Sequence, residues 1–112
     1  MEIQERKNNN INIVSVSGKL DSYSSIELEK KLDSLIASAQ VQLVADFDRL
    51  EYISSSGLRV LLATLKKVKK QNGDLKLACL KPFIKEVFDI SGFTQLFTIT
   101  DNVDAAVASF NS

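Results

Sequence analysis

The chain opens with a pattern typical of two β-strands joined by a turn. β-Branched residues stand at positions 11, 13, 14 and 16, and the run that they form stops at Gly18, as expected of a strand. A weaker extended segment precedes this run and ends in the turn-forming sequence Asn8-Asn9-Asn10. We therefore predict that the chain begins with a β-hairpin.

Two longer segments carry apolar residues at spacings of three and four, which places them on one stripe of a helix. The first begins where Ser24-Ser25-Ile26-Glu27 matches a capping box, in which a serine and a glutamate satisfy free N–H groups. The second follows the turn Ser54-Ser55-Ser56-Gly57 and ends at Asn72-Gly73. The stripe residues are Leu28, Leu32, Leu35, Ile36 and Ala39 in the first helix, and Leu58, Leu61, Leu62, Leu65 and Val68 in the second.

The segments between these helices predict further strands. Residues 41–47 are almost continuously apolar, which is the pattern of a central parallel strand covered on both faces. The stretch after them, through Tyr52, is expected to be a loop. Residues 75–79 alternate as a strand does, and a short strand is expected around residues 96–99.

Two shorter helices complete the predicted fold. Pro82 suits the first turn of a helix that ends near Gly92, and Asp101 or Asn102 can cap a last helix from about residue 103 to residue 110. Strands and helices thus alternate behind the opening hairpin. This order predicts a single α/β domain over residues 1–112, with a mixed, largely parallel β-sheet of about five strands and about four helices packed against it.

Composition narrows the classes of partner. Hydrophobic residues make up 45% of the chain, enough for one core, and 14 basic side chains balance 14 acidic ones. This balance argues against binding to nucleic acid or to an anionic membrane. The cluster Lys66-Lys67-Val68-Lys69-Lys70 is interpreted as a solvated helix end, where cations offset the helix dipole. Because the first seven residues carry charges where a signal peptide is apolar, we expect a cytoplasmic protein without membrane insertion.

The sequence also lacks the residues of common catalytic and metal sites. It contains no histidine, and its one cysteine, Cys79, lies in an apolar run, where a buried and unreactive thiol is expected. Its four glycines form no phosphate-binding loop. Among its carboxylates, Asp21, Asp46 and Asp48 included, spacing alone identifies no acid–base pair. We therefore expect no enzyme activity, no metal and no cofactor, and a nucleotide-binding protein or enzyme is the least favoured class.

The serine-rich turn before the second helix is the candidate site. A serine at this junction can accept a hydrogen bond from a free N–H group of the helix, and Gly57 removes side-chain bulk beside it. Local chemistry alone favours an ordinary helix cap. A functional interpretation requires further support.

That support comes from a family resemblance that spans essentially the whole chain. Four segments resemble, in order, the successive motifs of the STAS family: Gly18-Lys19-Leu20-Asp21, Val44-Ala45-Asp46-Phe47, Tyr52-Ile53-Ser54-Ser55-Ser56-Gly57-Leu58 and Ser91-Gly92-Phe93-Thr94-Gln95-Leu96-Phe97. Their joint order and spacing are more specific than any one of them. Within this family, the chain resembles the bacterial anti-sigma factor antagonists.

The resemblance implies a function based on partner switching. In such antagonists, the serine directly before the glycine of this turn, here Ser56, is phosphorylated by a partner that is both an anti-sigma factor and a serine kinase of the GHKL type. The unmodified protein binds this partner and frees the sigma factor, the phosphorylated form is released, and a metal-dependent serine phosphatase resets the switch. The antagonist itself catalyses nothing. The resemblance also assigns Asp21 to the surface near the phosphorylation site.

The expected partner surface is the start of the second helix, with Ser54, Ser55, Gly57 and Arg59 beside Ser56. One position departs from the family pattern, because many phosphorylated members have aspartate where this chain has Ser54. Ser54 and Ser55 therefore remain competing acceptors. The alternative function keeps the fold without phosphorylation, as a constitutive STAS interaction subunit of a transport or signalling complex.

Overall fold

Two N-terminal strands form one edge of the sheet. The computed structural model describes residues 1–110, and in it β1 (Glu2–Asn8) pairs with β2 (Ile11–Leu20) in antiparallel register. The chain reverses at Asn9, whose φ of 56° lies in the left-handed region that asparagine tolerates. The predicted hairpin is confirmed.

The later strands all run parallel to β2. They are β3 (Gln42–Asp46), β4 (Leu50–Ile53), β5 (Asp74–Ala78) and β6 (Thr98–Thr100). The order across the sheet is β1-β2-β3-β5-β6, and β4 pairs separately with β2. The predicted mixed, largely parallel sheet is thus confirmed, with β4 as an additional short strand where a loop was expected.

Gly18 explains how β2 serves two parallel partners. Residues 12–15 of β2 pair with β3 and residues 18–20 pair with β4, and the pairing with β4 shifts register between Gly18 and Lys19. Gly18 has a φ of +85° and donates its N–H to the carbonyl oxygen of Arg49 at 3.0 Å. The prediction that the strand stops at Gly18 was wrong, because a glycine in this conformation forms a bulge that bends a strand and lets it continue to Leu20.

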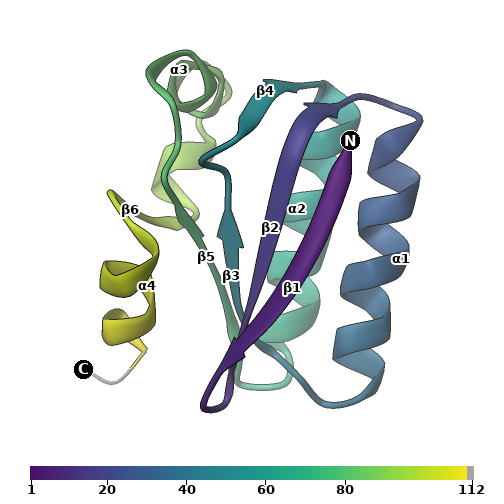
Figure 1. Ribbon diagram of the computed structural model, residues 1–112, viewed down its shortest axis with the longest axis vertical. Helices are drawn as coiled ribbons and strands as arrows, with labels where there is room; N and C mark the ends of the chain where they lie inside the picture. Colours follow the sequence, from purple (N-terminus) through teal and green to yellow (C-terminus); the bar gives the residue numbers. More distant parts are fainter. Residues whose placement is uncertain (111–112) are drawn as a thin grey trace.

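Helices cover both faces of the sheet (Figure 1). α1 (Ser24–Ala37) and α2 (Ser55–Lys69) lie side by side on one face, and α4 (Val103–Ser109) lies on the other. α3 (Pro82–Ile90), which starts at the predicted proline, lies at one end of the molecule and leads into the short 3₁₀ turn η1 (Phe93–Gln95). The four predicted helices are all present.

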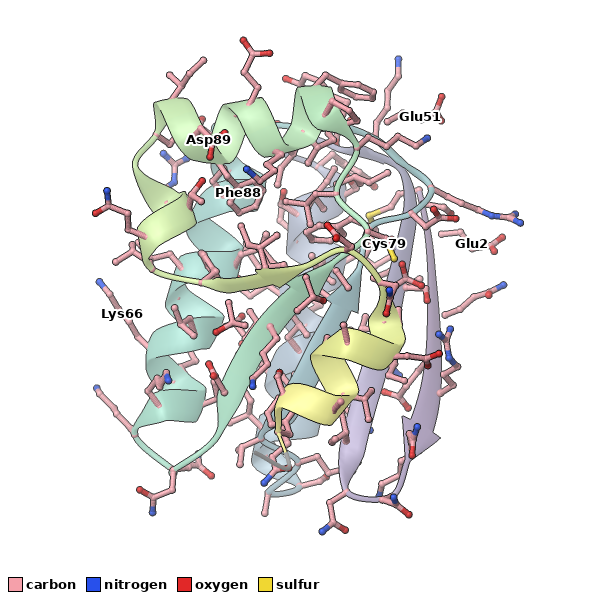
Figure 2. The ribbon with its side chains drawn as sticks, turned by 90° about the vertical axis from the view of Figure 1, so that its left-hand side faces the viewer. Glu2, Glu51, Lys66, Cys79, Phe88 and Asp89 are labelled. Carbon is pink, nitrogen blue, oxygen red and sulfur yellow. The ribbon has the colours of Figure 1, made fainter. Side chains whose placement is uncertain are left out.

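The two faces have separate apolar cores. The larger core joins the sheet to α1, α2 and α3, and in Figure 2 Phe88 points inward from α3, with its ring edge-on to that of Phe97 at 5.9 Å. The smaller core lies beneath α4 and contains Ile11, Ile13, Val44, Ala78 and Ala106. Asn102 caps α4, since its Oδ1 accepts the N–H of Ala105 at 2.7 Å, which selects one of the two predicted caps.

The lysine cluster lies exposed at the end of α2, as the sequence predicted. Lys66 projects away from the helix in Figure 2. Lys67 pairs with Asp33 of α1 at 2.8 Å, and Lys69 pairs with Asp74 at 3.4 Å. Within residues 1–110, none of the helices is both long enough and apolar enough to cross a membrane.

Cys79 lies in the segment between β5 and α3 (Figure 2). Its side chain is half-buried. Burial, together with the nearby Asp46 and Asp48 carboxylates, raises the pKa of the Cys79 thiol to about 11. The thiol is therefore protonated at neutral pH, which agrees with the predicted low reactivity, but the prediction of a buried side chain was wrong, because Cys79 follows the end of β5 and is half-buried.

We expect iodoacetamide to alkylate Cys79 of the folded protein at least about a hundredfold more slowly than a free cysteine at about pH 7.5. A pKa of about 11 in place of about 8.5 lowers the thiolate fraction roughly 300-fold. Mass spectrometry of samples taken over time, in buffer and in concentrated denaturant, measures the two rates. Equal rates would contradict the assignment.

The same pKa makes stability depend on pH. Since the folded state favours the thiol, this contribution to the free energy of unfolding is complete below about pH 8.5 and is lost as pH rises toward 11. A Cys79→Ser variant is the control, because it lacks this ionisation.

Candidate functional site

Ser54 forms the junction between β4 and α2. It has extended backbone angles, and its Oγ accepts the N–H of Gly57 at 3.2 Å, so that it is the N-cap of α2. Its own N–H donates to the carbonyl oxygen of Leu20 at 2.9 Å. Ser54 therefore joins the helix start to the end of β2, and its hydroxyl has a structural role.

Gly57 is required by close packing. A Cβ atom there would lie 2.9 Å from Cγ of Leu20, a distance that real Cβ atoms essentially never show, and 3.0 Å from Cγ1 of Ile53, which is tighter than nine in ten real Cβ contacts. The first turn of α2 can thus rest on the ends of β2 and β4 only because this position has no side chain. This contact fixes the place of the neighbouring serines.

Ser55 and Ser56 lie in the first turn of α2, where backbone N–H groups have no partner within the helix. Ser55 is exposed, and Ser56 is half-buried. The hydroxyl oxygen of Ser56 accepts a hydrogen bond from Nη2 of Arg59 at 3.3 Å. The turn thus presents two hydroxyls, one of them already in contact with a cation.

Ser56 and Arg59 line an open groove between α1 and α2. Its volume is about 340 Å³, and Ile26 and Glu29 of α1 line its opposite side. Ile26 is 55% exposed, and the neighbouring Tyr23 is 87% exposed. The groove therefore combines three serines, one acidic and one basic side chain, and apolar surface open to a partner.

Asp21 lies at the surface two residues before Tyr23, the N-cap position of α1, and its side chain accepts N–H groups at the helix start. Its Oδ1 accepts the N–H groups of Tyr23 at 3.1 Å and of Ser24 at 2.8 Å, while the Ser24 hydroxyl accepts the N–H of Asp21 at 2.9 Å. Hydrogen bonds from the Ser24 backbone and side chain hold the pKa of Asp21 below its usual range. The residue that follows it, Ser22, lines the groove with Ser56.

The hydrogen bonds between Asp21 and Ser24 replace the capping box that the sequence predicted. The sequence predicted that Ser24 caps the helix and that Glu27 reaches back, but Ser24 is the first helical residue and is the one that reaches back. The reciprocal pair is Asp21 with Ser24, three residues earlier. Aspartate and serine are both good capping residues, so the spacing alone left either frame open.

Five of the six predicted site residues lie at the start of α2, whereas the sixth, Asp21, precedes α1 and does not line the groove. Ser54, Ser55, Ser56, Gly57 and Arg59 all lie within the first five helical positions of α2 or at its cap. Sequence reasoning missed the α1 side of the groove. The available signal was Ile26, an apolar residue outside the apolar stripe of its helix.

Other polar groups suggest no second centre. Among residues 1–110, no group of three or more cysteine or carboxylate side chains could hold a metal ion. A polar hollow of about 260 Å³ lies over β1 and β2. Its half-buried carboxylate, Asp46, already accepts from Ser15 at 3.2 Å and lies 4.0 Å from Arg6. The groove beside Ser56 is the better candidate.

We expect Asp21→Ala to lower the midpoint of urea denaturation while the circular dichroism spectrum stays that of the native fold. Asp21→Asn should retain most of the stability at pH 7, because an asparagine oxygen caps a helix equally well. The lowered pKa means that the carboxylate stabilises the fold above its unfolded pKa. This stabilisation is lost as pH falls through the folded pKa. Urea titrations at several pH values measure both effects, and a midpoint unchanged in Asp21→Ala would contradict the cap.

Comparison with known proteins adds to this geometry. The model of the STAS domain family matches residues 2–106. BtrV of Bordetella bronchiseptica, whose name marks it as a proposed anti-sigma factor antagonist, is 38% identical over 100 residues, which cover 89% of this chain and 86% of that protein. The anti-sigma-B factor antagonist of Bacillus subtilis is 33% identical over 107 residues, which cover 96% and 97% of the two chains.

Solved structures share the fold. The unphosphorylated form of the anti-sigma factor antagonist SpoIIAA superposes with a TM-score of 0.86 at 20% identity, covering 98% of this chain and 96% of that one. The phosphorylated form of SpoIIAA from Bacillus gives 0.78 at 19% identity, covering 97% and 99%. At this identity the likeness is one of fold.

Proposed function

The chain belongs to the STAS domain family, and from that membership we propose that it is an anti-sigma factor antagonist whose binding is switched by phosphorylation of Ser56. In the unmodified state it binds an anti-sigma factor that is also a GHKL-type serine kinase. The kinase transfers the γ-phosphoryl group of ATP to Oγ of Ser56, which loses its proton, and ADP leaves. A metal-dependent serine phosphatase restores the hydroxyl. The domain binds and is modified but catalyses nothing, and the proposal keeps the cytoplasmic location expected from the sequence.

The observation that carries this proposal is the position of Ser56. Its hydroxyl lines an open groove in the first turn of α2, directly before Gly57. Relatives that match along most of their length are named anti-sigma factor antagonists, and SpoIIAA has a phosphorylated form. These names support an antagonist role for this chain and a role for phosphorylation in it.

The geometry also favours Ser56 over its neighbours as acceptor. The hydroxyl of Ser54 is used as the helix cap, so that its modification would remove a hydrogen bond from the start of α2. Ser55 is exposed but is not adjacent to the glycine. Serine at position 54 also fills the capping role that aspartate can fill, which supports treating the departure from the family pattern as a conservative change.

Phosphorylation can act here without unfolding the domain. A phosphate adds about 1.5 to 2 negative charges. No acidic residue lies in the first turn of α2, and the helix dipole there favours an anion. The chain therefore tolerates the charge, while a partner shaped to a neutral serine does not. Asp21, Ser54, Ser55, Gly57 and Arg59 complete the proposed contact surface.

Phosphopeptide mapping of the protein isolated from its own cells is the direct test. We expect Ser56 to be modified in a substantial fraction of molecules in at least one growth state. Modification found at Ser54 or Ser55 instead would overturn the assignment. Complete absence of phosphate in every state would favour the constitutive interaction subunit.

Substitutions at Ser56 test the consequence for binding. We expect Ser56→Ala to bind the anti-sigma factor and Ser56→Glu to bind at least about a hundredfold more weakly, since removing a charge from water in an interface costs several kcal/mol. Titration calorimetry at constant salt measures both affinities. Ser34→Glu is the matched control, because Ser34 is an exposed serine of α1 that does not line the groove, and urea denaturation should show that none of the three variants unfolds the domain. Equal affinities would contradict the switch.

A further inference from the structure

We propose that Arg59 is the intramolecular receptor for the phosphoryl group on Ser56, so that phosphorylation occupies a cation that is free for a partner in the unmodified protein. This inference rests on the proposed phosphorylation of Ser56. It assigns Arg59 a role in the modified state in addition to its place on the contact surface.

The contact that suggests this role already exists. Arg59 stands three residues after Ser56, which places both side chains on the same face of α2. Its Nη2 lies 3.3 Å from Oγ of Ser56, the atom that receives the phosphoryl group. A short rotation of an exposed arginine side chain is enough to follow the new oxygens, so that no element of the fold needs to move.

The Ser56 hydroxyl accepts only a small part of the hydrogen-bonding capacity of the Arg59 guanidinium. Arginine has five N–H donors in a planar fork that matches phosphate, and a serine hydroxyl accepts only one of them. In the part of the chain that the structure describes, residues 1–110, no carboxylate lies within ion-pair distance of Arg59, whereas Lys31 and Lys67 pair with Glu5 and Asp33. Three phosphate oxygens would replace a weak acceptor with strong, charged ones.

The charged groups around the groove define the electrostatics. Arg59 faces the groove from α2, and Glu29 faces it from α1. Glu29 opposes a second negative charge in this space, while Arg59 and the free N–H groups of the first turn favour it. Without Arg59, the phosphate would meet Glu29 with only the helix dipole to offset it.

The consequence is a switch that changes two contact groups at once. Phosphorylation places a negative charge at the groove and, in the same step, takes the guanidinium away from the acidic groups of a partner. Loss of an interfacial cation and gain of an interfacial anion both weaken the same complex. Neither change requires a rearrangement of the backbone.

The test uses the full chain with phosphoserine incorporated at position 56 during synthesis, so that no kinase is needed. We follow the ³¹P chemical shift of this phosphoserine with pH in otherwise native protein, in Arg59→Gln and in Lys66→Gln. Lys66→Gln is the matched control, because it removes the same charge from the exposed far end of α2. Circular dichroism of the unphosphorylated variants establishes that each is folded.

We expect Arg59→Gln to raise the second pKa of the phosphate by roughly 0.5 to 1, the size expected for one close, solvent-exposed charge. Lys66→Gln should leave it nearly unchanged, and Glu29→Gln should lower it. Phosphorylation should also lower the thermal midpoint more in Arg59→Gln than in native protein. An equal pKa in native protein and Arg59→Gln, or an equal rise in Lys66→Gln, would overturn the proposal.

These outcomes are separate from those of the proposed function. If Ser56 is never modified in cells, the ³¹P result still reports whether Arg59 holds a phosphate. If Ser56 is modified and the pKa does not respond to Arg59, the switch stands and the receptor role is lost.

Discussion

The contact between the start of α2 and the ends of β2 and β4 is the constraint on which the site depends. A side chain at position 57 would collide with Leu20 and Ile53, so that only glycine fits there. The N–H of Ser54 donates to the carbonyl oxygen of Leu20 and holds the same turn in place. The first turn of the helix is thus held by packing from below and by a cap at its end. Hydroxyls on such a turn gain a fixed position without being buried, which suits a site that must be reached by another protein.

The bulge in β2 makes this contact possible. Gly18 lets one strand pair with β3 along its first part and with β4 along its last part, so that Leu20 and Ile53 end next to each other. β4 then delivers the chain to Ser54. The bulge in β2, the strand β4 and the start of α2 are therefore positioned by one set of contacts. Asp21 follows the end of β2 and precedes the start of α1, so the same contacts also place Asp21. The two helix starts come together because both follow strands that pair with each other.

The sequence predicted most of this architecture because long periodic segments leave little choice. The leucine stripes of α1 and α2 and the apolar strand around Val44 are of this kind. The failures occurred where only a few residues decide. β4 has two buried side chains, Leu50 and Ile53, in four residues, too few for a recognisable period.

The site shows the same division. Ser56 and Gly57 were predicted from a local motif and a family resemblance, and both lie in the turn as expected. The α1 side of the groove depends on how two helices pack, and spacing along one helix does not contain that information. The sequence analysis assigned the capping role at the start of α1 to the wrong residue, because aspartate and serine are both good capping residues. Only the observed hydrogen bonds show that the Asp21 side chain accepts the N–H of Ser24 and that the Ser24 hydroxyl accepts the N–H of Asp21.

The exposure of Tyr23 has an optical consequence. The chain has no tryptophan and two tyrosines. Tyr23 precedes α1 beside the groove, and Tyr52 lies in β4 shortly before α2, with 87% and 48% of their surfaces exposed. Tyrosine fluorescence of the native chain thus originates at one end of the molecule, the end that carries Ser56. The domain contains two intrinsic fluorophores, both at the end that carries its candidate interface, and binding of a partner without aromatic emission of its own could be followed there with no label attached.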